Sequence, residues 1–110
     1  MSSAIPIACD LGALDSGERE RRRSLAGRLV ACVEEVRELQ NGYGLRLRND
    51  AVALVEAAEF ISLERRCCRF FEFHLDVEPG GGPIWLRLTG PEGVKEFLEA
   101  NSELIKSRRS

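Results

Sequence analysis

The chain has 110 residues and a formal net charge of −2, with 44% hydrophobic and 31% charged residues. This length suits one domain with an ordinary core, and the composition is that of a folded chain rather than a disordered one. The near-zero charge argues against a strongly basic nucleic-acid binder. We therefore expect a single domain over residues 1–110.

Hydrophobic periodicity predicts the order helix, hairpin, helix, hairpin and helix along the chain. The expected ranges are 16–31 for the first helix, 33–39 and 43–48 for the first hairpin, 51 to 67 or 68 for the second helix, 71–77 and 84–88 for the second hairpin, and about 91 onward for the last helix. This order, α-β-β-α-β-β-α, predicts an α+β fold with a four-stranded, mainly antiparallel sheet and three helices packed on one face.

Capping signals mark the start of each predicted helix. Asp15 with Glu18 has the spacing of a capping box, and Asn49 and Asp50 can cap the second helix. Thr89 with Glu92 has the same spacing and predicts a capping box that opens the last helix. The helix boundaries are thus expected from short-range patterns alone.

The second predicted helix has two apolar sides. At 3.6 residues per turn, one side carries Leu54, Ala57, Ala58, Ile61 and Cys68, and the other carries Val52, Phe60, Leu63 and Cys67. One side can cover the sheet, while the other needs a neighbouring helix or a second subunit, because soluble proteins seldom expose large apolar patches. We expect a homodimer.

The start of the chain lacks a basic region followed by a long apolar run, and no later segment reaches the roughly 18 apolar residues of a membrane span. A cytoplasmic location is expected. The four cysteines, Cys9, Cys32, Cys67 and Cys68, should then stay reduced, because the cytosol opposes structural disulfides. Thiol chemistry is favoured over disulfide cross-links.

Two adjacent cysteines, Cys67 and Cys68, end the second predicted helix. The neighbouring Arg65, Arg66 and Arg69 would favour the thiolate form if they lie close to the sulfurs. A disulfide between adjacent cysteines is disfavoured, because their Cα atoms are about 3.8 Å apart and usual disulfides need roughly 4.4 Å or more. The pair predicts a site for a thiophilic metal, a metalloid or an oxidant.

Two thiolates leave such a site incomplete. Cys67 and Cys68 leave the helix about 100° apart, so they need not share a pocket. Cys9 lies in an irregular N-terminal segment that is free to cross the end of the second helix, and it is the best candidate for a third ligand. Cys32 falls on the apolar side of the first helix and is assigned to packing. The predicted metal ligands are Cys67, Cys68 and Cys9. The ion that they would bind is a soft metal or a metalloid.

The alternative is a structural or protein-interaction module without a ligand. Free cysteine is among the most buried residue types, so Cys67 and Cys68 can also be core residues. Trp85 on the polar side of its strand would then mark a partner surface or a small-molecule cleft. His74 is expected on the same polar side, and a Cys/His nucleophile lacks an orienting group. We predict no catalytic residues and favour a binding protein over an enzyme.

Charged and glycine-rich runs suggest no further site. The four arginines in residues 19–23 alternate with glutamates and predict a solvated helix face, so nucleic-acid binding is not expected. The glycines of residues 80–82 lack the pattern of a phosphate loop and predict a hairpin turn.

The segment ERRCCRFFEFHLDVEPGGGPIWLRLTGPEGVKEFL, together with IACDL near the start, resembles a family of small uncharacterised bacterial proteins. Its members share an ERxCCxF helix end and a GGGPxWLRLTGPEG hairpin, and the likeness spans most of the chain. The resemblance implies that Cys9, Cys67 and Cys68 form one set that excludes Cys32. It implies no enzyme class.

Overall fold

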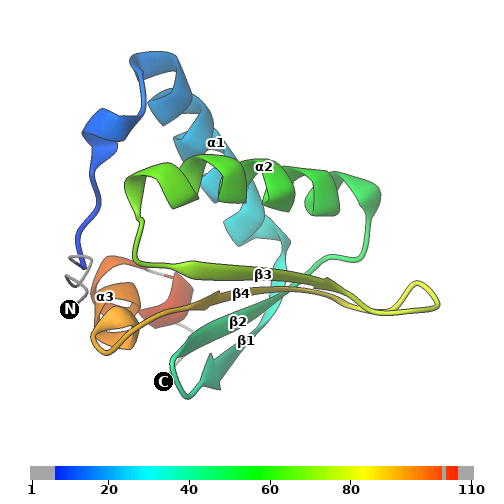
Figure 1. The fold of residues 1–110 in the computed structure, drawn as a ribbon. Coiled ribbons are helices and arrows are strands. Elements are labelled where there is room, and N and C mark those ends of the chain that lie inside the picture. The colour runs from blue at the N-terminus through cyan, green and yellow to red at the C-terminus, as the bar shows by residue number, and fades with distance from the viewer. Residues whose placement is uncertain (1–6, 103, 107–110) are drawn as a thin grey trace.

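The computed structural model describes residues 7–102 and 104–106, and its elements follow the predicted order (Figure 1). They are η1 Leu11–Ala13, α1 Ser16–Cys32, β1 Val33–Leu39, β2 Gly42–Leu47, α2 Ala51–Cys67, β3 Glu72–Val77, β4 Ile84–Thr89 and α3 Val94–Asn101. The predicted α+β class, with a four-stranded antiparallel sheet and three helices, is confirmed.

The sheet has the strand order β1-β2-β4-β3, and every neighbouring pair is antiparallel. Each hairpin therefore contributes one central and one edge strand. Figure 1 shows α1 and α2 crossing on one side of the sheet, with α3 at one end beside the N-terminal segment. Buried apolar residues recur at every second position of the central strands, including Leu45 and Leu47 of β2 and Leu86 and Leu88 of β4. Figure 1 shows the C-terminal end of α2 and helix α3 toward the same end of the sheet.

The first two predicted helix caps are confirmed. An Asp15 carboxylate oxygen accepts the Glu18 backbone N–H at 2.8 Å, and the Glu18 carboxylate accepts the Asp15 N–H at 3.0 Å. The Asp50 side chain accepts the Ala53 N–H at 2.8 Å. Both caps satisfy backbone donors that a helix start leaves without helical partners.

The predicted capping box at Thr89 and Glu92 is wrong. Thr89 is the last residue of β4, where it pairs with Gly42 on one side and Glu72 on the other. This pairing keeps Thr89 in the sheet, so α3 starts only at Val94, and its N-cap is Gly93, which has φ 103° and makes no side-chain cap hydrogen bond. Strand pairing overrides the local capping signal here.

The second apolar side of α2 meets α1 within the same chain. Phe60, Leu63 and Cys67 are buried, and the ion pairs Arg21–Glu59 at 2.7 Å and Arg28–Glu56 at 2.5 Å join the two helices. A second subunit is therefore not needed to cover most of this side, and the homodimer stays a prediction.

The sequence predicts no membrane-spanning segment, and the helices of the structure bear on this prediction. Among residues 7–102 and 104–106, the structure has no helix that combines the length and the apolar character needed to cross a bilayer.

Two glycines provide a matched test of the fold. A Cβ at Gly42 would collide with the backbone of the neighbouring strand, including the Thr89 Cα at 2.8 Å, whereas a Cβ at Gly27 in α1 would have no neighbour within 4 Å. We expect Gly42→Ala to lower the free energy of unfolding by about 2 kcal/mol or more. Gly27→Ala should raise it by about 0.5 to 1 kcal/mol, because alanine favours the helix. Urea unfolding would measure both, and equal effects would contradict the predicted strand contact.

Candidate thiol site

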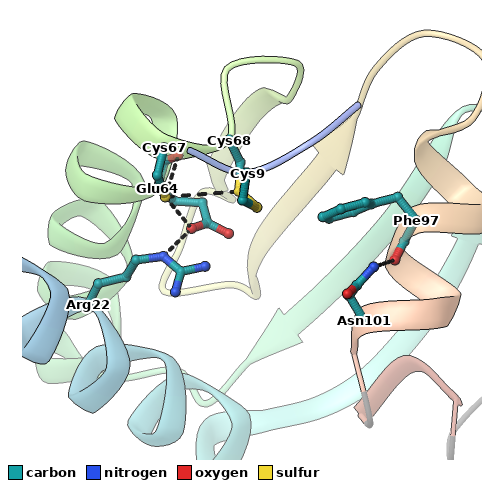
Figure 2. The surroundings of a disulfide bond; sticks show 7 residues. All are labelled: Cys9, Arg22, Glu64, Cys67, Cys68, Phe97 and Asn101. Carbon is teal, nitrogen blue, oxygen red and sulfur yellow. Dashed lines mark hydrogen bonds and ion pairs between the residues drawn. A yellow bond between two sulfur atoms is a disulfide. The ribbon is translucent and has the colours of Figure 1, made fainter. Parts of the chain in front are cut away.

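Cys9 and Cys68 form a disulfide in the structure (Figure 2). The bond joins residues 59 positions apart, with a Cα–Cα distance of 4.6 Å that falls in the usual range. It corrects the expectation that all four cysteines are free thiols; the free ones are Cys32 and Cys67. Cys32 is buried at the end of α1, as its assignment to packing predicted.

The N-terminal segment reaches Cys68 because it docks on the end of α2. The Asp10 backbone N–H donates to the Cys67 carbonyl at 2.7 Å. That carbonyl belongs to the last turn of the helix, whose acceptors have no partners within the helix. The docking places Cys9 beside Cys68, so the sequence-based hypothesis that Cys9 crosses the end of this helix holds in the structure.

The two adjacent cysteines also lie together. Cys67 ends α2 and Cys68 is its C-cap, where the backbone leaves helical geometry. Their sulfur atoms are 3.9 Å apart, and each residue is only 1% exposed. The expected angle of 100° between the side chains applies to a continuing helix, and here the helix ends between them. Three sulfur atoms therefore gather at one end of α2.

A buried ion pair borders the sulfurs. Glu64, one turn before Cys68, accepts a hydrogen bond from Arg22 Nε at 2.5 Å and another from the Cys67 thiol at 3.4 Å, both at Oε1 (Figure 2). Glu64 is buried and Arg22 is partly buried. The two charges compensate each other in a region of low dielectric, where either charge alone would be costly.

Arg22 is the site residue that sequence reasoning missed. The arginines of residues 19–23 were predicted to form a solvated face, and Arg22 departs from that prediction. Its position carried a signal, because Arg22 precedes Leu25 by three residues and Leu29 by seven, which is the spacing of one helix face. Leu25 and Leu29 are buried, so Arg22 points in the same direction.

The electrostatics of Cys67 are opposite to the sequence-based prediction. Burial raises the pKa of the Cys67 thiol above its ordinary value, and the negative charge of Glu64 raises it further, while Arg22 acts in the opposite direction. The neighbouring arginines do not hold a thiolate here: Arg65 and Arg69 are exposed, and Arg66 binds Glu18 at 2.7 Å. Cys67 is accordingly a protonated thiol at neutral pH.

Removing the charge of Glu64 should lower the pKa of Cys67. In a Glu64→Gln variant, the carboxylate no longer opposes ionisation and Arg22 still favours it, so the thiolate should form at lower pH than in the native chain. The ultraviolet absorbance of the thiolate would report this titration in a Cys32→Ala background, in which Cys67 is the one free thiol. A Cys67→Ala variant supplies the blank. An unchanged or higher pKa would contradict the role assigned to Glu64.

The site also contains a possible ligand set for a metal ion. The ligand atoms of Glu64, Cys67 and Cys68 all lie within 4.8 Å of one another, and all three residues are buried. Thiolates select soft ions, and a carboxylate oxygen can complete such a set. The Cys68 sulfur is engaged in the disulfide, so it can serve as a ligand only after reduction. Reduction also frees the Cys9 sulfur.

An apolar cavity of about 460 Å³ opens beside the disulfide. Helices α1, α2 and α3 supply most of its wall. It is lined by Cys9, Arg22, Ala26, Leu29, Val30, Phe60, Glu64, Phe71, Leu88, Phe97, Leu98, Asn101, Ser102, Leu104 and Ile105. Figure 2 shows Phe97 and Asn101 of α3 across this space from Glu64 and the disulfide. The volume falls within the usual range of small-molecule sites, about 300 to 1,000 Å³.

The other residues weighed from the sequence lie on the strands. The Arg37 guanidinium carbon lies 4.3 Å from the Trp85 ring centre, so a cation–π contact partly covers this side chain. The Arg87 Nε–H donates to Asp76 at 2.8 Å on the neighbouring strand. His74 has its Nε2 3.6 Å from Glu72 and is not part of the Glu64, Cys67 and Cys68 cluster. A partner at Trp85 stays a prediction.

The fold and the site together define an α+β protein with a disulfide, an adjacent buried thiol and an apolar cavity. No protein-family model matches the chain, and neither a curated protein nor a solved structure is significantly similar to it. The resemblance drawn from the sequence motifs therefore stays a prediction.

Proposed function

We propose that the reduced protein binds or senses a thiophilic metal or metalloid through Cys67 and Cys68, with Cys9 as the third sulfur. The Cys9–Cys68 disulfide is then the oxidised form of the same site, through which an oxidant is sensed. One observation carries this proposal: three cysteines from two distant segments, with Glu64 beside them, meet at one end of α2. If the cytoplasmic location holds, cellular thiols would maintain the reduced form.

Reduction opens the site by a balanced exchange. A dithiol reductant transfers two electrons to the Cys9–Cys68 bond, its own sulfurs form a disulfide, and two protons produce the free thiols of Cys9 and Cys68. Cys67 needs no reduction, because it is already a thiol. Three thiols then lie at the end of α2.

The burial of Cys67 and Cys68 favours a trivalent metalloid over a divalent cation. Arsenite can condense with three thiols, forming three As–S bonds and releasing three waters, and the product carries no net charge. A divalent ion would require buried thiolates, and the raised pKa of Cys67 makes ionisation unfavourable. A neutral product suits a site in which Cys67 and Cys68 are each 1% exposed, although Cys9 lies at its exposed edge.

Intact-mass spectrometry under native conditions would test this function. We expect the reduced protein to gain one arsenic per chain from arsenite, and Cys67→Ala or Cys68→Ala variants to lose the adduct. Cys32→Ala is the matched control, because Cys32 is also a buried free thiol but lies at the end of α1. Absence of an adduct with both arsenite and mercuric ion in the reduced, folded protein would overturn the proposal.

The alternative function is a structural or protein-interaction module in which the sulfurs stabilise the fold. It is favoured by the exposed Val52 and Val55 at the start of α2, which are 60% and 64% exposed and would suit a homodimer. Sedimentation equilibrium distinguishes this alternative from the proposed function. A dimer that dissociates in a Val52→Asp/Val55→Asp variant, in a protein that binds no arsenic, would favour the alternative.

A further inference from the structure

The geometry points to a substrate class for this site: aryl-substituted trivalent arsenicals, with the arsenic on the Cys9 and Cys68 sulfurs and the aromatic ring in the adjacent cavity. This inference rests on the proposed function, because it requires thiols that react with a metalloid. It goes further by naming the organic substituent and the residues that recognise it.

The cavity lies where such a substituent would need to go. Cys9 forms part of its wall, so a group bonded to the Cys9 sulfur has direct access to it. The remaining wall is mostly apolar and includes the three rings of Phe60, Phe71 and Phe97. Val30, at 50% exposure, leaves one side open to solvent. A route for entry and an aromatic interior are therefore both present.

Inorganic arsenite would leave this cavity unused. Its three oxygens are replaced by three sulfurs, and no organic group remains to fill an apolar space of about 460 Å³. An aryl group gains free energy by leaving water for such a wall, and rings near Phe97 can adopt favourable offset or edge-to-face contacts. The cavity thus has a chemical reason to discriminate between arsenicals that carry and lack an aromatic ring.

The reaction uses two of the three sulfurs. An arylarsonous acid, with one As–C bond and two As–OH groups, condenses with the thiols of Cys9 and Cys68. Two As–S bonds form, two As–O bonds break, and the two thiol protons leave in two water molecules; the arsenic stays trivalent. These are the sulfurs that the disulfide already shows can approach each other within bonding distance. Cys67 then remains a thiol.

The test compares three arsenicals on the reduced 110-residue chain: phenylarsonous acid, methylarsonous acid and arsenite. Affinities come from competition with a small dithiol, followed by native mass spectrometry. We expect the phenyl compound to bind at least about tenfold more tightly than the methyl compound, because of its larger apolar surface. Cys67→Ala should abolish binding of arsenite and preserve binding of the phenyl compound.

Variants of two phenylalanine residues test whether the preference for the phenyl over the methyl compound arises in the cavity. Phe97→Leu should reduce the ratio of phenyl to methyl affinity several-fold, whereas Phe73→Leu, a partly buried ring outside the cavity wall, should leave the ratio unchanged. Ala26→Phe, which fills part of the cavity, should lower the same ratio and leave arsenite binding intact. If a variant fails to fold, the ratio of phenyl to methyl affinity measured on the wild-type chain still tests the assignment of the cavity.

Failure of this inference can be distinguished from failure of the proposed function. If arsenite binds but the phenyl and methyl compounds bind equally to the wild type, the assignment of the cavity is wrong and the proposed function stands. Phenyl binding that is insensitive to both Phe97→Leu and Ala26→Phe in folded variants also overturns the assignment. If no arsenical binds the reduced protein, the proposed function fails, and this inference fails with it.

Discussion

A Cys9→Ser variant is expected to unfold with a free energy about 3 to 4 kcal/mol lower than that of the oxidised native chain. The Cys9–Cys68 bond joins residues 59 positions apart, so it closes a long loop and restricts the unfolded chain strongly. For a chain of this length, the loss corresponds to a fall of roughly 10 to 15 °C in Tm. Thermal unfolding followed by circular dichroism measures it.

The reductant provides the control for this prediction. The native chain with excess dithiol should unfold at about the same temperature as Cys9→Ser, and Cys9→Ser should not respond to the reductant. A native Tm that is unaffected by reductant, and equal to that of the variant, would contradict a disulfide in the folded protein. The reduced form should still fold, because Asp10 also binds the Cys67 carbonyl and Arg66 binds the Ala13 carbonyl.

The second large effect is expected at the buried ion pair. An Arg22→Met substitution keeps an apolar side chain of similar length and leaves the Glu64 carboxylate without its cationic partner. Removing one member of a buried pair is strongly destabilising, so we expect a loss of about 3 kcal/mol in the free energy of unfolding. Urea unfolding at constant redox state measures the loss.

Two further variants make the comparison specific. Arg22→Met/Glu64→Leu should recover most of the lost stability, because replacing both charges removes the buried carboxylate. Arg21→Met removes the neighbouring, exposed pair with Glu59 and should have little effect, since solvent screens that pair. If Arg21→Met and Arg22→Met destabilise the protein equally, burial does not determine how much the Arg22–Glu64 pair contributes to the free energy of unfolding.

The two predicted effects concern two neighbouring contacts of the same site. The disulfide holds the N-terminal segment on the end of α2, and the ion pair holds α1 against the last turn of that helix. Both contacts shape the space between Cys9 and Phe97. Cys9→Ser removes one sulfur ligand and Arg22→Met removes the ion pair, so each variant is expected to weaken arsenical binding as well as the fold.

Local patterns in the sequence were enough to predict the elements and their order. The capping box of Asp15 and Glu18, the cap at Asp50 and the alternation of buried apolar residues in β2 and β4 each depend on neighbours a few positions apart. Two apolar sides on α2 also predicted two partners for that helix. These signals are local, so the amino-acid order alone determines them.

The tertiary structure decided the features that depend on distant segments. Thr89 has a capping pattern, but pairing with two strands keeps it in the sheet. Arg22 lies in a run of charges, and only the packing of α1 on α2 brings it to Glu64. The sequence placed reactive sulfur at Cys67 and Cys68, whereas docking of the N-terminal segment paired Cys68 with Cys9 and left Cys67 as a buried thiol. Contacts between distant segments set the chemistry of these groups, and the spacing of nearby residues does not encode which distant groups meet.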